Sequence, residues 1–194
     1  HHSGAVAERV AGALARRVPG VQVAAGPPEE GEQLVIVRGD HDAFEVSLDG
    51  SGGLLSRRGY REASAKAPLR ENLAAALLLA AGWQGQGVLL DPLCGAGTLA
   101  IEAAEIAVGL AAGRNRGFSC EDWGDRDVAA LARQRELAEG RPRRPLSAAG
   151  ISIFASDRVQ GAITATVGNA TSAGVLAHMI LGQHDFFELK PPVP

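Results

Sequence analysis

Three aspartates each follow an apolar run that has the length of a β-strand. Asp91 ends the apolar run GVLLD, and Asp157 and Asp185 end two later apolar runs, ISIFASD and MILGQHD. The first run continues into a short glycine loop, so that residues 91–104 read DPLCGAGTLAIEAA. Carboxylates at the ends of neighbouring strands can bind an ammonium group or ribose hydroxyls. The pattern therefore predicts a nucleotide-type ligand.

The glycine loop suits an anionic part of that ligand. Gly95 and Gly97 permit backbone torsions and a close approach that a Cβ would block. Thr98 begins an amphipathic run whose N-terminal amides favour a negative charge nearby. Gly-Ala-Gly alone is a weak signal, so the residues around it decide the ligand.

Two classes of nucleotide compete for this loop. GAGTLA fits the dinucleotide fingerprint G-x-G-x-x-[G/A], which requires an acid about 20 residues later. Glu121 and Asp122 lie near that spacing, but they fall in the polar segment GRNRGFSCEDWGDRD instead of ending a strand. Asp91 would repel a pyrophosphate and suits an ammonium group, which S-adenosylmethionine (SAM) carries together with a carboxylate, a ribose and an adenine. The residues favour SAM and leave a dinucleotide oxidoreductase as the alternative.

Helices and strands alternate around the loop. Helical patterns are expected at 69–81, 98–108 and 160–173, and a further helix is expected to run through residue 137. Strands are expected at 87–91, 151–157 and 179–185. This alternation predicts right-handed crossovers and a parallel sheet. The expected fold is an α/β, Rossmann-like doubly wound sheet.

A different pattern precedes this domain. Residues 5–18 have helical spacing, and residues 34–39 and 43–52 are expected to form two paired strands. One helix and two strands make a small α+β unit with little core of its own. A basic segment follows, which is either a phosphate-facing surface that binds RNA or an ordinary solvated surface. Its basic residues are Arg57, Arg58, Arg61, Lys66 and Arg70.

The composition excludes several classes. The chain has 194 residues, of which 46% are hydrophobic, and a net charge of −3, which describes a globular protein without a global basic signature. No apolar run approaches the roughly 18 residues of a membrane span, so a cytoplasmic protein is expected. The five histidines and the two cysteines lack metal-ligand spacing, so no metal is predicted. Cys94 is expected to pack beneath the loop and not to act as a nucleophile.

The motif and its surroundings resemble a known family. DPLCGAGTLAIEAA resembles the D-P-x-C-G-x-G-T motif of a THUMP-domain group of Rossmann-type methyltransferases, the UPF0020 family. SLDGSGGLLSRRGYREASAKAPLRENLAAALLLAAGW is similar to that family's connection between its THUMP and catalytic domains, and GRNRGFSCEDW to its excursion after the motif. Studied members methylate the 2-amino group of guanine in large-subunit ribosomal RNA. The resemblance thus implies SAM-dependent methylation of an exocyclic base amine in RNA, with transfer RNA or adenine as alternatives.

The resemblance also implies the cofactor-binding residues. The methionine end of SAM would lie against Asp91 and the loop, the ribose against Asp157, and the adenine against Asp185 and the backbone of Phe186. Asp157 could instead cap a helix and Asp185 a turn. The full implied set is Asp91, Pro92, Cys94, Gly95, Gly97, Thr98, Asp157, Asp185 and Phe186.

The sequence departs from the family at three places. Val159 stands where the family usually has a second acid for the ribose. The helix after it has threonines and glycines where other residues are usual, so we expect it to be less regular. The family's catalytic motif, [N/D]-P-P-[Y/F], does not occur, and ELKPPVP does not replace it, so no catalytic residue is assigned. We expect a fragment that is inactive alone: a partial THUMP-like unit at 1–52, a basic linker at 53–68, and the first part of a methyltransferase domain at 69–194. A non-catalytic RNA-binding module is the alternative from another class.

Overall fold

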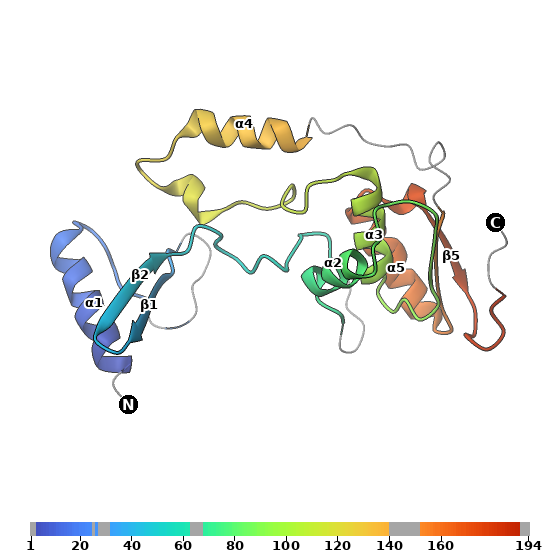
Figure 1. Ribbon diagram of the computed structural model, residues 1–194, viewed down its shortest axis with the longest axis horizontal. Coiled ribbons are helices and arrows are strands. Elements are labelled where there is room, and N and C mark those ends of the chain that lie inside the picture. Colours follow the sequence, from blue (N-terminus) through green and yellow to red (C-terminus); the bar gives the residue numbers. More distant parts are fainter. Residues whose placement is uncertain (1–2, 25, 27–31, 63–67, 140–151, 191–194) are drawn as a thin grey trace. The chain divides into compact units, whose positions relative to one another are not determined.

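The chain forms two compact units. The computed structural model describes residues 3–24, 26, 32–62, 68–139 and 152–190 (Figure 1). One unit comprises His1–Gly53 with Phe118–Arg126, and the other comprises Leu54–Gly117 with Asp127–Pro194. The segment around residue 120 therefore belongs to the first unit, although it follows the glycine loop in the sequence.

The first unit is a helix beside a two-stranded sheet (Figure 1). Helix α1 (Ser3–Arg17) begins two residues earlier than expected, and strands β1 (Val35–Asp40) and β2 (Ala43–Leu48) pair antiparallel. The short 3-10 helix η1 (Ser119–Asp122) joins this unit, because the Cys120 amide donates to the Gly50 carbonyl at 3.2 Å. The Trp123 indole N–H donates to the Gln33 side chain at 2.7 Å. The helix and the strand pair that the sequence predicted are both present.

The second unit contains the parallel α/β sheet. Its order is β3 (Val88–Asp91), β4 (Ser152–Asp157) and β5 (Met179–Gln183), and both neighbouring pairs are parallel. Helices α3 (Thr98–Val108) and α5 (Gln160–Ser172) provide the crossovers and contact the sheet. The expected α/β architecture with a parallel sheet is confirmed, and each boundary expected in this unit lies within about two residues of the observed one.

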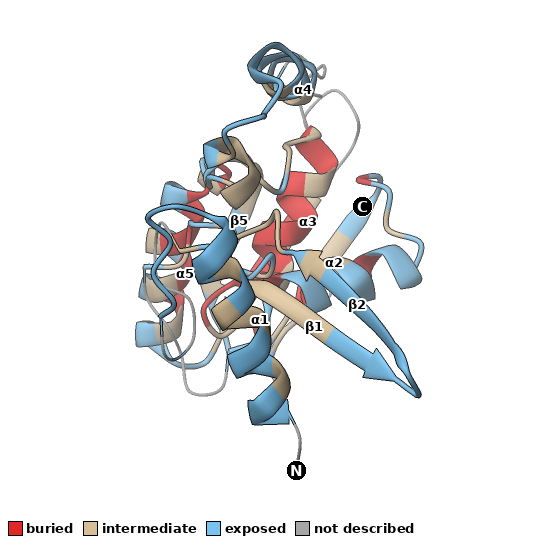
Figure 2. Cartoon of the chain, turned by 90° about the vertical axis from the view of Figure 1, so that its left-hand side faces the viewer, coloured by how far each residue is buried: buried red, intermediate tan, exposed pale blue. Residues whose placement is uncertain are grey.

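The core of this unit lies around α3. Figure 2 shows α3 as largely buried, and its alanines allow close packing against α2 (Glu71–Ala80) and the sheet. Ile101 and Ile153 are both 0% exposed at the centre of the cluster. Helix α4 (Val128–Glu139) has no buried residue, and the Asp127 carboxylate caps its first turn at the Ala130 amide. The helix that follows the glycine loop is therefore the best-buried of the described elements.

Residues 54–62 of the predicted basic linker belong to the second unit. Tyr60 is 1% exposed and its hydroxyl donates to Glu102 on α3 at 3.3 Å. Arg58 forms an ion pair with the same carboxylate at 3.4 Å. A large aromatic residue and a charge partner on α3 draw this segment into the second unit, so it is part of the α/β fold.

Candidate functional site

The three aspartates lie along one edge of the parallel sheet. Asp91 is the last residue of β3 and pairs in register with Ala155. Asp157 is the last residue of β4 and pairs with Gln183, while Asp185 lies two residues beyond the end of β5. Parallel strands bring their carboxyl ends to the same edge, which is where open α/β sheets bind ligands. The edge thus gathers two of the acids at strand ends and the third just after a strand.

The carboxylate of Asp157 closes the glycine loop. Its Oδ2 accepts a hydrogen bond from the Gly95 amide at 3.0 Å, and its Oδ1 accepts one from the Val159 amide at 2.9 Å. A carboxylate has about four acceptor positions, so each oxygen keeps capacity for a further donor such as a hydroxyl. Asp157 therefore organises the loop and the turn before α5 and can still bind a ligand.

Asp91 is a buried carboxylate without a cationic partner among the described residues. It is 8% exposed, and its one hydrogen bond among the described residues comes from the Leu93 amide at 3.4 Å. Burial raises the pKa of Asp91, the Leu93 amide lowers it, and the nearby charge of Asp157 raises it further. No ion pair joins Asp91 to a basic side chain in the part of the chain that the structure describes. A cationic ligand group would relieve this unfavourable electrostatic environment.

The glycines of the loop are required by its geometry. Gly97 has a φ of 82° and is the N-cap residue of α3. A Cβ at this position would lie 2.6 Å from Cγ2 of Thr166, which no real Cβ tolerates without a shift. Gly95 also has a positive φ, of 55°. The loop can approach α5 this closely only because Gly97 has no side chain.

Two polar residues of α5 hold the loop from below. Thr166 Oγ1 donates to the Gly95 carbonyl at 3.0 Å, and Asn169 Nδ2 donates to the Ala96 carbonyl at 3.0 Å. Both side chains are completely buried. Sequence reasoning did not find them, and it expected α5 to be less regular, whereas the helix runs unbroken from Gln160 to Ser172. Their spacing of three residues, on the face that also carries Ala170, is the signal that could have revealed them.

Cys94 packs beneath the loop. It is 7% exposed, and its Sγ lies 3.7 Å from Thr166 Oγ1. Burial is the main cause that raises the pKa of the Cys94 thiol to about 11. A thiol that stays protonated at neutral pH is a poor nucleophile, which favours the packing role.

Of the remaining predicted cofactor residues, Pro92 and Thr98 lie at the glycine loop, and Asp185 and Phe186 lie in the turn after β5. Pro92 is partly buried in the loop, and Thr98 is 5% exposed at the start of α3. Asp185 accepts a hydrogen bond from the Phe187 amide at 3.0 Å, so it caps a turn. The rings of Phe186 and Phe187 contact edge to face, with centroids 5.5 Å apart. The amide of His184, directly before Asp185, donates to the Asp157 carbonyl at 3.2 Å, which attaches this turn to the end of β4. The adenine role of Asp185 and Phe186 stays a prediction.

The basic cluster does not form one exposed surface. Arg58 and Arg61 make ion pairs with Glu102 and Glu71, and their side chains are only 15% and 17% exposed. Arg57 and Arg70 are exposed. Lys66 lies outside the described residues. Arg58 and Arg61 thus hold the second unit together, which leaves Arg57 and Arg70 as the accessible charges of the predicted RNA surface.

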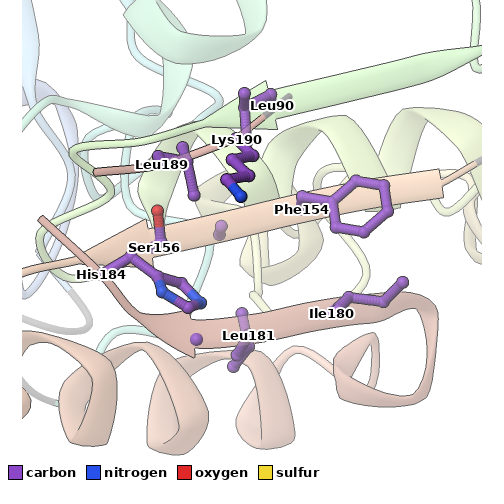
Figure 3. A pocket seen from close by; sticks show the side chains of 10 residues that line it. Leu90, Phe154, Ser156, Ile180, Leu181, His184, Leu189 and Lys190 are labelled. Atoms are coloured by element: carbon purple, nitrogen blue, oxygen red, sulfur yellow. The ribbon is translucent and has the colours of Figure 1, made fainter. Parts of the chain in front are cut away.

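A separate cavity of about 270 Å³ lies on the sheet (Figure 3). Its floor contains the in-register side chains of Leu90, Phe154 and Ile180. Ser156, His184 and Lys190 contribute polar groups, and the Ser156 hydroxyl is buried without a hydrogen-bond partner among the described residues. None of the three aspartates is among the lining residues, so this cavity is distinct from the edge formed by the glycine loop.

The described residues contain neither a candidate membrane span nor a candidate metal-ligand cluster. No helix in these ranges has both the length and the hydrophobicity that crossing a membrane requires. No group of three or more His, Cys, Asp or Glu side chains within them could hold a metal ion.

The chain is similar to known methyltransferases and methylases in sequence and in structure. The chain is 49% identical, over 124 residues, to the Ribosomal RNA large subunit methyltransferase K/L of Allochromatium vinosum, covering 60% of this chain and 16% of that protein. The crystal structure of SMU.472 complexed with SAH has a TM-score of 0.74 at 32% identity, covering 84% of this chain and 42% of that one. The predicted N6-adenine-specific DNA methylase from Listeria monocytogenes str. 4b F2365 has a TM-score of 0.75 at 29% identity, covering 96% and 47%. The chain therefore spans less than half the length of these relatives.

A family model accounts for most of the second unit. Residues 58–193 match the model described as UPF0020: RMKL-like, methyltransferase domain. The match begins at Arg58, inside the segment that packs onto α3, and it includes the glycine loop and all three strands of the parallel sheet. This chain belongs to the UPF0020 family of RMKL-like methyltransferase domains.

Proposed function

We propose that this chain forms the SAM-binding part of an RNA methyltransferase. The observation that carries the proposal is the environment of Asp91, a buried carboxylate beside Asp157 that makes no ion pair with a described residue. An ammonium group meets the electrostatic requirement of such a site, whereas a pyrophosphate would add negative charge to it. SAM combines an ammonium with a carboxylate, and the SMU.472 relative was solved with SAH.

The residues present fit the cofactor. Asp91 would hold the ammonium, and the amides of the loop and of the first turn of α3 would face the carboxylate. Asp157 would accept hydrogen bonds from the ribose hydroxyls through the acceptor positions that Gly95 and Val159 leave open. Asp185 and Phe186 would lie beside the adenine. When bound, the cofactor supplies a methyl group on a positively charged sulfur.

We propose an exocyclic base amine of RNA as the acceptor, with the 2-amino group of guanine in large-subunit ribosomal RNA first. The name of the Allochromatium vinosum relative supports ribosomal RNA. The name of the Listeria relative favours the N6 amine of adenine in DNA as the second candidate. Because [N/D]-P-P-[Y/F] is absent from these 194 residues, we expect them to bind the cofactor without transferring the methyl group.

Isothermal titration calorimetry of the chain with SAH and with NADH tests the proposal. We expect saturable binding of SAH and none of NADH. Binding of NADH without SAH would support the dinucleotide oxidoreductase instead. Binding of RNA with neither cofactor would support a non-catalytic RNA-binding module.

A further inference from the structure

The guanidinium of Arg61 joins the start of α2 to the start of α3. Its Nε donates to Glu71 Oε1 at 2.8 Å, at the start of α2. Its Nη2 donates to the Thr98 hydroxyl at 2.9 Å and to the Leu69 carbonyl at 3.0 Å. The planar guanidinium can hold these acceptors at fixed relative positions, which a lysine ammonium could not do with the same geometry. Arg61 therefore connects the segment before α2 to the first residue of α3.

The Arg61 contact lies in a protected environment. The side chains of Arg61 and Glu71 are 17% and 9% exposed, and Thr98 is 5% exposed. Charge-assisted hydrogen bonds that are shielded from water are stronger than those on a surface. The Arg61–Thr98 bond can thus restrain the start of α3, where the glycine loop enters the helix.

A second connection ties the same segment to the loop. The amide of Glu62, next to Arg61, donates to Asn169 Oδ1 at 2.9 Å. Asn169 Nδ2 in turn donates to the Ala96 carbonyl at 3.0 Å. The segment is therefore attached to the loop at Ala96 through Asn169 and at Thr98 through Arg61. The Glu62–Asn169 bond thus holds the backbone beside Arg61 in place without involving the Arg61 side chain.

We infer that Arg61 is a positioning residue for the cofactor loop. Through Thr98 it fixes the first turn of α3, so that the loop amides and Asp91 keep the spacing that the amino-acid end of SAM requires. This inference rests on the proposed function, because it concerns the same cofactor site. It also replaces an RNA-contacting role for Arg61 with a role inside the fold.

The test is a double-mutant cycle on SAM affinity in the full chain. Arg61→Met removes both the ion pair and the Thr98 contact, whereas Thr98→Val removes only the hydroxyl and leaves the Arg61–Glu71 pair. We expect each single variant to weaken SAM binding by about tenfold, as for the loss of one shielded charge-assisted hydrogen bond. The double variant should bind no more weakly than Arg61→Met, because both changes break the same bond.

Arg114→Met is the matched control. Arg114 pairs with Glu105 of α3 at 2.7 Å, and its side chain is also 17% exposed, but it contacts the far end of the helix. It should lower the unfolding midpoint as Arg61→Met does while changing SAM affinity less than about twofold. If Arg61→Met fails to fold, the comparison of Thr98→Val with Thr98→Ser decides, since serine restores the acceptor and should restore affinity.

The outcomes separate the two claims. Failure of the wild-type chain to bind SAM would count against the proposed function itself. Wild-type binding with unchanged affinity in Arg61→Met or Thr98→Val would overturn the positioning role. Additive losses in the double variant would also overturn it, because Arg61 would then act independently of Thr98.

Discussion

The Gly95 amide and the Asp157 carboxylate lie 3.0 Å apart and are hydrogen-bonded across two neighbouring strands. The bond joins the loop after β3 to the end of β4, and the adjacent Cys94 amide donates to the Ser156 carbonyl at 2.9 Å. The loop and the acid are therefore one structural unit before any ligand binds. Preorganisation of this kind lowers the conformational cost of binding.

Gly97→Ala should destabilise the second unit more than Gly87→Ala. The two glycines have φ values of 82° and 81°, so alanine is strained at both by roughly 1–2 kcal/mol. Only at Gly97 would the added Cβ meet a neighbour, 2.6 Å away at Thr166, whereas nothing lies within 4 Å at Gly87. Urea denaturation of both variants measures the difference, which should exceed about 1 kcal/mol.

Thr166→Ser should relieve the steric clash that Gly97→Ala creates. Serine removes Cγ2 and keeps the hydroxyl that binds the Gly95 carbonyl. Adding it to Gly97→Ala should recover part of the lost free energy of unfolding. Equal losses in Gly97→Ala and Gly87→Ala would mean that the loop does not approach α5 as closely as described.

Glu102 should make stability depend on pH. Burial is the main cause that raises its pKa from 4.5 to about 7, although the Arg58 charge lowers it. A carboxyl whose pKa is raised by folding contributes stability below pH 4.5, and this contribution is lost as the pH rises to about 7. Glu102→Gln removes this titration, so its free energy of unfolding relative to wild type should increase from pH 5 to pH 8 by on the order of 2–3 kcal/mol.

The test depends on how the difference in free energy of unfolding between Glu102→Gln and wild type changes with pH. Replacing the carboxyl with an amide adds an offset that does not change with pH, because glutamine does not titrate, and the effect of the Arg58 charge on the ionised carboxylate is already contained in the pKa of Glu102. Chemical denaturation of both proteins at a series of pH values measures the difference. Parallel stability curves for Glu102→Gln and wild type would show that Glu102 does not titrate in this range.

Arg57 and Arg70 should contribute to RNA affinity through charge alone. Both are exposed, unlike Arg58 and Arg61, which are held in ion pairs. Replacing both with glutamine should reduce the slope of log affinity against log salt by roughly 0.7 per charge, as expected for single-stranded phosphate contacts. Fluorescence anisotropy with a ribosomal RNA fragment measures the slope.

Arg133→Gln is the control for the RNA measurement. Arg133 is also exposed, but it lies on α4 and outside the cluster. Its removal should leave the slope unchanged. The same slope reduction per removed charge in Arg133→Gln as in the double variant would indicate nonspecific electrostatic attraction to the whole protein.

The sequence predicted the strands and the loop because their signals are local. The apolar run ending at Asp91, the two glycines and the helical spacing after Thr98 each require only a few neighbouring residues. The partners of these residues could not be predicted in the same way. Asn169 binds Ala96, which is 73 residues away, and Arg61 binds Thr98, which is 37 residues away.

The basic segment could not be divided from the sequence into paired and exposed charges for a related reason. Its composition indicates charge but not the acids that meet it after folding, and Glu71 and Glu102 supply those acids from two helices. Both glutamates lie in otherwise apolar helical stretches, where a buried charge needs a partner. Tyr60 likewise showed no local sign of the buried position that it occupies.

Asp91→Asn tests the central claim most directly, because it should move affinity and stability in opposite directions. Asparagine keeps the acceptor for the Leu93 amide and removes a buried charge whose pKa burial already raises, so the unfolding midpoint at neutral pH should stay the same or increase. SAM affinity, measured by calorimetry, should fall by at least about tenfold as the ammonium loses its partner. Methylthioadenosine, which lacks the ammonium, should bind both proteins equally. Unchanged SAM affinity in a folded Asp91→Asn variant would contradict the account.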